Sequence, residues 1–322
     1  MTVGRHDATG HGMTPLPHGP FHGLSAFPLT PLRDDVLDAP ALRGLVGRLA
    51  PAPAAEGADI GPALVDSIGA LGSTGSYAYL DREEWTTALR TILAGAGGTP
   101  VVAGVGALRT REVLARARTA EQLGAAGLLL APVSYQPLRD SEVIGLFAAV
   151  AEAVDLPICI YDNPGTTRFR FSLDLYARLS GIPSVTGVKI PPTDGTEAQP
   201  ADRLARIREA VGPDAAIGIS GDAAAAAHLA AGADAWHSVV GGLFPRAART
   251  LFDAARSGAS DTAHDLEELW PLLAQHGSVR VMAAAAAELD LAADDCLPHP
   301  LRPLEEDERA EVARTVRGAG LA

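Results

Sequence analysis

The sequence has almost no lysine. Of its 26 basic residues, Lys189 is the single lysine and the other 25 are arginines. Arginine stays charged at any working pH, whereas a buried lysine can lose its proton and become a nucleophile. We therefore single out Lys189 as a candidate nucleophile. The alternative interpretation is a surface lysine that happens to be unique.

Other scarcities exclude whole classes of protein. Two cysteines, Cys159 and Cys296, are too few for a disulfide framework, and Cys159 lies in an apolar segment typical of a buried small side chain. We find no apolar run as long as a membrane span and no signal peptide in the first twenty residues. A net charge of −13 argues against nucleic-acid binding, which needs a basic surface. These features predict a cytoplasmic protein that binds neither nucleic acid nor membrane.

The first twenty residues are rich in Gly, His, Pro and Thr, and we predict a disordered tail over residues 1–20. His11, His18 and His22 have no Cys or carboxylate at metal-ligand spacing, so we expect them to be solvated and expect no metal site. Residues 50–62 are rich in Pro, Ala and Gly, which is typical of an inserted surface loop.

From residue 23 onwards, short apolar segments alternate with helical patterns. The predicted strands are short and apolar on both faces, as expected when both faces are buried; they span residues 23–30, 64–71, 100–105, 127–131, 156–161, 185–190, 215–220 and 234–240. A helix is predicted after each strand, the first over 36–49 and the second capped by Asp81 with Glu84 three residues later.

Eight repeated strand–helix units predict an α/β fold of the (β/α)8 TIM-barrel type over residues 21–258. A C-terminal extension, residues 259–322, is predicted to add three helices packed on the barrel. A doubly wound open sheet is the alternative, but no glycine fingerprint follows the first strand.

The lysine lies near the end of one of these predicted strands. Val185, Val188 and Ile190 are apolar and mostly β-branched, which favours a buried strand, and Pro191-Pro192 ends it. In a barrel the chemistry gathers where strands end and loops begin. Candidate residues at those ends are Thr30, Ser73, Thr74, Gly75, Ser134, Tyr161, Lys189 and Gly221.

Two of these segments indicate particular chemistry. The Gly72-Ser73-Thr74-Gly75 turn offers hydroxyls and backbone N–H groups that can hold a carboxylate, or it is an ordinary tight turn. Tyr161 ends the strand before that of Lys189, so its phenol can relay a proton to a substrate there, or its ring only packs. Nearby, we expect Asp222 to cap the next helix and His237 to pack in the core.

The ordered set of these motifs resembles the dihydrodipicolinate synthase / N-acetylneuraminate lyase family of class I aldolases. The matching motifs are Thr30-Pro31, Gly72-Ser73-Thr74-Gly75, Tyr161-Asp-Asn-Pro164 and Gly187-Val-Lys189, and the resemblance covers about residues 22–250. It implies a homotetramer or homodimer in which Lys189 forms a Schiff base with a 2-keto acid such as pyruvate. Tyr161 would then relay protons, Ser73 and Thr74 would hold the keto-acid carboxylate, and no cofactor would be needed.

Departures from the family pattern bear on the second substrate. Dihydrodipicolinate-forming members carry Glu where Ser76 stands, a tyrosine pair where Val133-Ser134 stand, and an arginine where Thr166 stands. We therefore predict a Schiff-base lyase or aldolase on a 2-keto acid that is not a dihydrodipicolinate synthase. The alternatives are a dehydratase or hydratase-aldolase on a deoxy-keto sugar acid or aryl-pyruvate, and a non-catalytic small-molecule sensor on the same scaffold.

Overall fold

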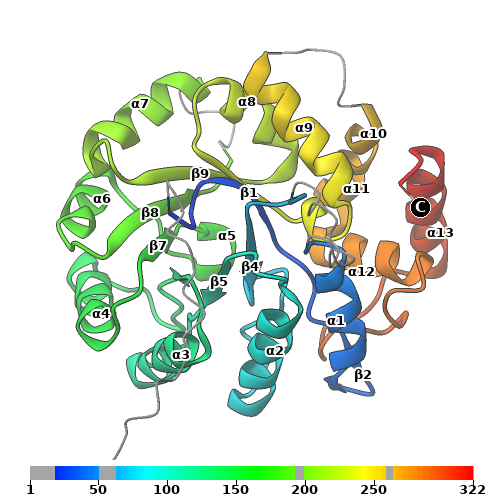
Figure 1. Ribbon diagram of the computed structural model, residues 1–322, viewed down its shortest axis with the longest axis horizontal. Coiled ribbons are helices and arrows are strands. Elements are labelled where there is room, and N and C mark those ends of the chain that lie inside the picture. The colour runs from blue at the N-terminus through cyan, green and yellow to red at the C-terminus, as the bar shows by residue number, and fades with distance from the viewer. Residues whose placement is uncertain (1–18, 51–62, 193–198, 259–263, 322) are drawn as a thin grey trace, which may run out of the picture.

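A computed structural model describes residues 19–50, 63–192, 199–258 and 264–321. Within them eight parallel strands close into a barrel in the order β1-β10-β9-β8-β7-β6-β5-β4 (Figure 1). The predicted (β/α)8 barrel with C-terminal helices is therefore confirmed. The barrel strands are β1 (Gly23–Ala26), β4 (Ser67–Ala70), β5 (Val101–Gly104), β6 (Gly127–Leu130), β7 (Ile158–Tyr161), β8 (Val185–Ile190), β9 (Ala216–Ser220) and β10 (Ala235–Ser238).

Helices cover the outside of the barrel. They are α1 (Ala39–Gly47), α2 (Arg82–Gly95), α3 (Thr110–Leu123), α4 (Asp140–Ala153), α5 (Pro164–Thr167), α6 (Leu173–Ser180), α7 (Pro200–Val211), α8 (Ala225–Ala230) and α9 (Pro245–Ser257), with 3-10 turns η1 (Asp222–Ala224) and η2 (Val240–Gly242). The capping box at Asp81 and Glu84 is confirmed, with hydrogen bonds of 2.9 and 3.0 Å. The predicted tail and the 50–62 insertion fall almost wholly outside the described residues.

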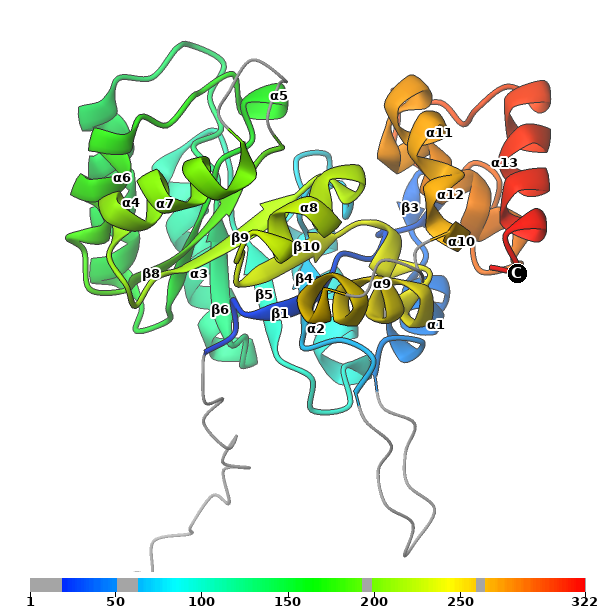
Figure 2. The ribbon, with the colours of Figure 1, turned by 90° about the horizontal axis from the view of Figure 1, so that it is seen from above.

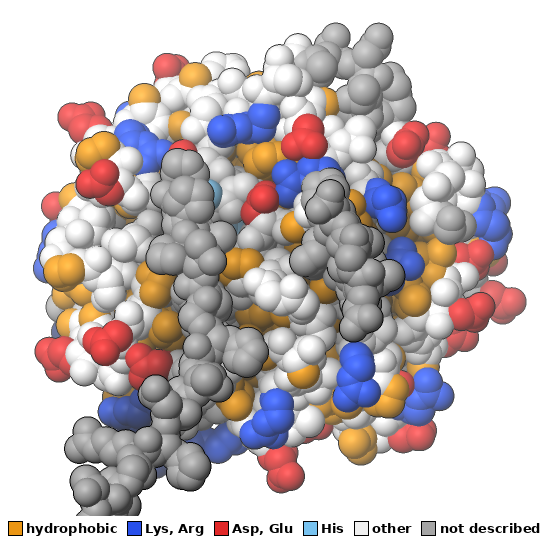
Figure 3. All heavy atoms as spheres, in the orientation of Figure 1, with side chains coloured by type: hydrophobic (Ala, Val, Ile, Leu, Met, Phe, Trp, Pro, Cys, Tyr) orange, Lys and Arg blue, Asp and Glu red, His pale blue; other side chains and the backbone are white. Residues whose placement is uncertain are grey.

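The C-terminal extension forms a group of its own beside α1 and α9 (Figure 2). We expected three helices, and the described part contains four helical segments: α10 (His264–Glu267), α11 (Leu269–His276), α12 (Ser278–Glu288) and α13 (Glu306–Gly318). The difference arises at Glu268, where a turn separates α10 from α11. On the face shown in Figure 3, acidic and basic side chains are interspersed around the edge of the molecule.

The predicted first helix begins too early. Val36–Leu37 form a short strand, β3, that pairs with β2 (Leu32–Arg33), and α1 starts only after Asp38, whose carboxylate accepts from the Ala41 N–H at 3.0 Å. Asp34 and Asp35 both have positive φ, 51° and 60°, as a tight hairpin turn of the mirror-image type requires. The Asp-Asp pair was the local signal for this hairpin.

Small residues inside the barrel make room for a few large ones. A separate interior cluster contains Phe21, Phe27, Cys159 and Tyr161, while the outward faces of the strands pack against the helices. Lys189 shares the inward face of β8 with Gly187, at which a Cβ would lie 2.7 Å from Phe21. The alternation of side chains along a strand therefore directs Lys189 into the barrel.

Candidate active site

Lys189 is buried near the carboxyl end of β8. Only 4% of its surface is exposed, so the alternative of a unique surface lysine is wrong. Its Nζ lies 3.8 Å from the ring centroid of Phe27 and 4.3 Å from that of Tyr161. Tyr161 is the partner of Lys189 in the β7–β8 register, so the expected proximity of these two residues is observed. The amine of Lys189 therefore lies against two aromatic rings inside the barrel.

Three side chains meet above the lysine at the mouth of the barrel. The hydroxyls of Tyr161 and Ser73 lie 3.0 Å apart, and Asn163 donates from Nδ2 to the Tyr161 hydroxyl at 2.9 Å and to Ser73 Oγ at 3.3 Å. Ser73 and Asn163 are half-buried, so this group reaches the surface. Either hydroxyl can be the donor in the bond between Tyr161 and Ser73. The arrangement can therefore move a proton between these two residues.

Sequence reasoning missed Asn163. Its segment was recognised, but a side chain two residues beyond a strand end could equally face solvent or its own turn. The local signal is the following Pro164, which starts α5 and fixes the chain direction just after Asn163. The backbone carbonyl of Asn163 also accepts the N–H groups of Thr166 and Thr167 at 3.1 and 3.0 Å. These bonds tie the residue to the first turn of α5, which leaves its amide aimed at the tyrosine.

Thr30, Thr74 and Gly75 also lie at this end of the barrel. Thr30 and Thr74 are buried, and Thr30 Oγ1 has no hydrogen-bond partner within the described residues. A Cβ at Gly75 would lie 3.1 Å from that oxygen and 3.0 Å from the backbone of Leu71, so the turn approaches both closely. Buried hydroxyls are normally hydrogen-bonded, which makes Thr30 Oγ1 a candidate contact for a bound polar molecule.

Gly221 and Asp222 lie beyond β9 on the other side of Lys189. Gly221 has φ +89°, a conformation that favours glycine, and packs against Pro192. The expectation that Asp222 caps the next helix is wrong, since its carboxylate accepts from Ser238 Oγ at 2.9 Å and from the Val239 N–H at 3.1 Å. Burial raises the pKa of Asp222 to about 6, against the opposing effect of those hydrogen bonds and of Lys189. The carboxylate instead ties β10 to the turn after β9.

Other sequence candidates do not join this group. Thr166 is exposed, and its hydroxyl donates to the backbone carbonyl of Asn163 at 3.4 Å. Ser134 is half-buried, and the adjacent Tyr135 is 89% exposed. Arg168 and Arg170, which follow Thr166, are both exposed. The half of the site that would bind a second substrate therefore contains no buried cation from this segment.

Two further groups in the barrel interior are held neutral. Burial raises the pKa of the Cys159 thiol to about 12. His237 is buried with both ring nitrogens unpaired within the described part of the chain, and burial, followed by the charge of Lys189, lowers its pKa well below the usual value. The expectation that both residues are packed in the core is confirmed.

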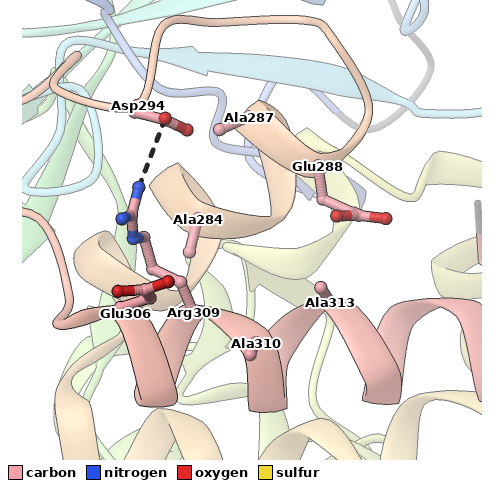
Figure 4. A pocket seen from close by; sticks show the side chains of 8 residues that line it. All are labelled: Ala284, Ala287, Glu288, Asp294, Glu306, Arg309, Ala310 and Ala313. Atoms are coloured by element: carbon pink, nitrogen blue, oxygen red, sulfur yellow. Dashed lines mark ion pairs between the residues drawn. The ribbon is translucent and has the colours of Figure 1, made fainter.

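A cavity of about 260 Å³ lies far from the lysine, between α12 and α13 (Figure 4). Alanines line it together with Glu288, Asp294, Glu306 and Arg309, and Arg309 pairs with Asp294 at 3.2 Å. Three carboxylates against one guanidinium disfavour an anionic ligand such as a keto acid. No lysine lines the cavity, so we do not assign it to the chemistry of Lys189. The described residues contain neither a cluster of His, Cys, Asp and Glu suited to a metal ion nor a helix long and apolar enough to cross a membrane.

The chain is a (β/α)8 barrel, and the polar and reactive side chains described above lie at the carboxyl ends of its strands. Residues 59–319 match the model of the dihydrodipicolinate synthetase family, and the chain belongs to that family and is a lyase. A curated relative, the 4-hydroxy-tetrahydrodipicolinate synthase of Alcanivorax borkumensis, is 32% identical over 263 residues, which is 79% of this chain and 86% of the relative.

Solved structures agree with this assignment. The dihydrodipicolinate synthase of Agrobacterium tumefaciens strain C58 is 42% identical with a TM-score of 0.84, covering 93% of this chain and 98% of its own. A chloride-inhibited dihydrodipicolinate synthase from Acinetobacter baumannii, solved in complex with pyruvate, is 27% identical with a TM-score of 0.80, covering 94% and 100% of the two chains.

Proposed function

We propose that the protein is a Schiff-base-forming lyase or aldolase that acts on a 2-keto acid through Lys189. The observation that carries the proposal is the buried amine of Lys189 against Tyr161, whose hydroxyl is bonded to Ser73 at the mouth of the barrel. Family membership supports it, and the pyruvate complex of the Acinetobacter relative supports a pyruvate-type substrate. The proposal requires no cofactor.

The proposed reaction begins when the neutral amine attacks the keto carbon. The carbonyl oxygen takes up two protons and leaves as water, and the nitrogen keeps one proton in the resulting iminium ion. That cation withdraws electrons, so a bond to the neighbouring carbon can break or form through an enamine. In this proposal Tyr161 gives and receives the protons, and Ser73 and Thr74 hold the substrate carboxylate with Thr30 beside them. The hydrogen bond between Tyr161 and Ser73 and the close approach of Gly75 to Thr30 support these roles.

The second substrate is not that of a dihydrodipicolinate synthase in this proposal. Thr166 is exposed and bonded to its own turn, and no buried guanidinium from its segment lies at the mouth. Ser134 and Gly221 would instead line a more open half-site. We also propose assembly as a homotetramer or homodimer, which light scattering of the purified chain would test.

The direct test traps the imine. The protein is treated with pyruvate and borohydride and digested, and the modified peptide is identified by mass. We expect the label on Lys189, the single lysine of the chain, and none on Lys189→Arg, because a guanidinium keeps the charge but is no nucleophile. Labelling of the N-terminal amine alone, or of nothing across a set of 2-keto acids, would contradict the proposal and favour a non-catalytic sensor.

A further inference from the structure

The amine of Lys189 is surrounded by aromatic rings. Its Nζ lies 3.8 Å from the centroid of Phe27 and 4.3 Å from that of Tyr161, and it lies over the rings in both cases. The ring of His237 meets Phe27 edge-on, with centroids 5.8 Å apart and planes at 76°. Within the described residues no carboxylate forms an ion pair with Lys189. A positive charge on this nitrogen is therefore in contact with ring faces.

The position of Phe27 is fixed by its neighbours. A Cβ at Gly69 would overlap the ring, and a Cβ at Gly72 would lie 2.9 Å from it, so these two glycines leave space for it. The backbone of Phe27 is held as well. Its N–H donates to the carbonyl of Ser238 at 2.9 Å, and Gly242 packs directly against the carbonyl of Phe27. The ring is 2% exposed. It therefore cannot swing away from the amine without disturbing two strands.

We propose that Phe27 is a catalytic residue, whose ring face stabilises the iminium ion on Lys189, with the Tyr161 ring as the second wall. The inference rests on the proposed function, since it concerns the cation formed there. An aromatic face carries negative potential that attracts a cation, and the attraction is strongest where water is excluded. The uncharged amine that attacks the keto carbon gains little from it, and the charge of the keto acid lies on its carboxylate. The cage thus favours the charged imine over free amine and keto acid.

The charged and titratable groups around the nitrogen support this assignment. Tyr161 and Cys159 face it from β7, His237 from β10 and Asp222 from the turn after β9. Cys159 and His237 are neutral at pH 7 for the reasons given above. Asp222 forms no ion pair with Lys189 within the described residues, and its carboxylate is bonded to Ser238 and Val239. The ring faces of Phe27 and Tyr161 are in contact with the nitrogen and respond to its charge.

The test measures the pyruvate concentration that gives half-maximal borohydride labelling of Lys189. Phe27→Leu removes the ring and keeps an apolar side chain, and we expect this concentration to rise about tenfold, equivalent to about 1.4 kcal/mol. A matched control is Phe21→Leu. Phe21 belongs to the same interior cluster but packs on Gly127 and Gly187. We expect its replacement to change the half-labelling concentration less than about twofold, a fifth or less of the change at Phe27.

Two further variants separate charge from shape. Replacing Phe27 with a trifluorinated phenylalanine keeps the ring but removes the negative potential of its face, and should also raise the half-labelling concentration. Tyr161→Phe keeps the second ring, so trapping of the imine on Lys189 should persist while turnover falls. Equal half-labelling concentrations for the wild type and the fluorinated protein would overturn the inference while leaving the imine intact. Failure of the wild type to label would instead overturn the proposed function.

Discussion

The hydroxyls of Ser73 and Tyr161 lie 3.0 Å apart although the two residues lie at the carboxyl ends of strands that are not neighbours in the barrel. Ser73 lies in the turn after β4 and Tyr161 ends β7, with β5 and β6 between them. The hydrogen bond therefore spans the mouth of the barrel above Lys189. It connects the proposed carboxylate-binding turn to the proposed proton relay.

Tyr161→Phe should keep the fold and slow turnover. The ring packs in the same space, but the hydroxyl that carries the proton is gone. We expect turnover on a substrate identified by keto-acid screening to fall by roughly 10²–10⁴-fold, the usual contribution of a general acid–base group. Steady-state kinetics and a thermal melt of both proteins check this. Wild-type kcat in the variant would remove Tyr161 from the mechanism.

Asn163→Asp should impair the same step by reversing a hydrogen bond. The amide donates to the Tyr161 hydroxyl at 2.9 Å, and a carboxylate of the same shape presents an acceptor and a charge instead. We expect kcat to fall about tenfold, since an ordinary hydrogen bond contributes about 0.5–1.5 kcal/mol and about 1.4 kcal/mol corresponds to a factor of ten in rate. Asn163→Ala, which only removes the donor, should lose less. If both variants matched the wild type, Asn163 would be a structural residue of α5 alone.

Condensation of pyruvate with aspartate semialdehyde should be slow or absent. Loss of a charge-assisted contact to the second substrate's carboxylate costs about 1.5–3 kcal/mol, or roughly ten- to over a hundredfold in binding. Thr166 has no cationic group for that contact, and its hydroxyl donates to the backbone carbonyl of Asn163. A coupled assay of the condensation checks the expectation, with a dihydrodipicolinate synthase as the reference. Turnover on the ordinary enzyme scale of ~1–1000 per second would contradict it.

Asp222→Asn should change how stability depends on pH. The pKa of Asp222 is raised to about 6 chiefly by burial, whereas an aspartate in an unfolded chain titrates near ~3.9. The folded state thus prefers the protonated form of Asp222. The stability that this preference adds is fully present below about pH 4 and is lost as the pH rises through about 6. Asn keeps an oxygen that can accept from Ser238 and Val239 but cannot ionise.

We therefore expect the unfolding free energy of the wild type, relative to Asp222→Asn, to fall as the pH is raised from about 4 to about 7. The gap between the folded and unfolded pKa values of Asp222 corresponds to a fall of about 3 kcal/mol at most. Urea unfolding of both proteins at the two pH values measures the difference and cancels the titration of the remaining carboxylates. A difference that is constant with pH would show that Asp222 titrates normally.

The barrel and the lysine strand could be predicted because their signals are local. Val185–Ile190 is the strand that the sequence indicated, and its register with β7 brings Tyr161 beside Lys189. Phe27 could not be found this way. Its ring reaches the amine only because Gly69, distant in sequence, leaves the space, and neither residue carries a polar signal.

Asp222 shows a second limit of sequence reasoning. Its position after Gly221 suits a helix cap, and the local pattern holds nothing that disfavours one. The chain instead enters a 3-10 turn there, and the carboxylate turns toward β10, where the Ser238 hydroxyl and a backbone N–H bind it. Whether the carboxylate binds the helix N-terminus or β10 depends on the tertiary structure, and the local sequence carries no information about it.

Because Lys189 is the single lysine of the chain, cleavage after lysine can also measure the unfolding of the barrel. A protease that cleaves only after lysine has one bond to cut in this chain, Lys189–Ile190, and that bond lies inside β8 between β7 and β9. Cleavage requires the strand to leave the sheet, so its rate follows the opening of the barrel and ignores fraying of the ends. Occupancy of the amine by a keto acid would abolish the cleavage site itself, so one digestion experiment reads both the stability of the sheet and the covalent state of its centre.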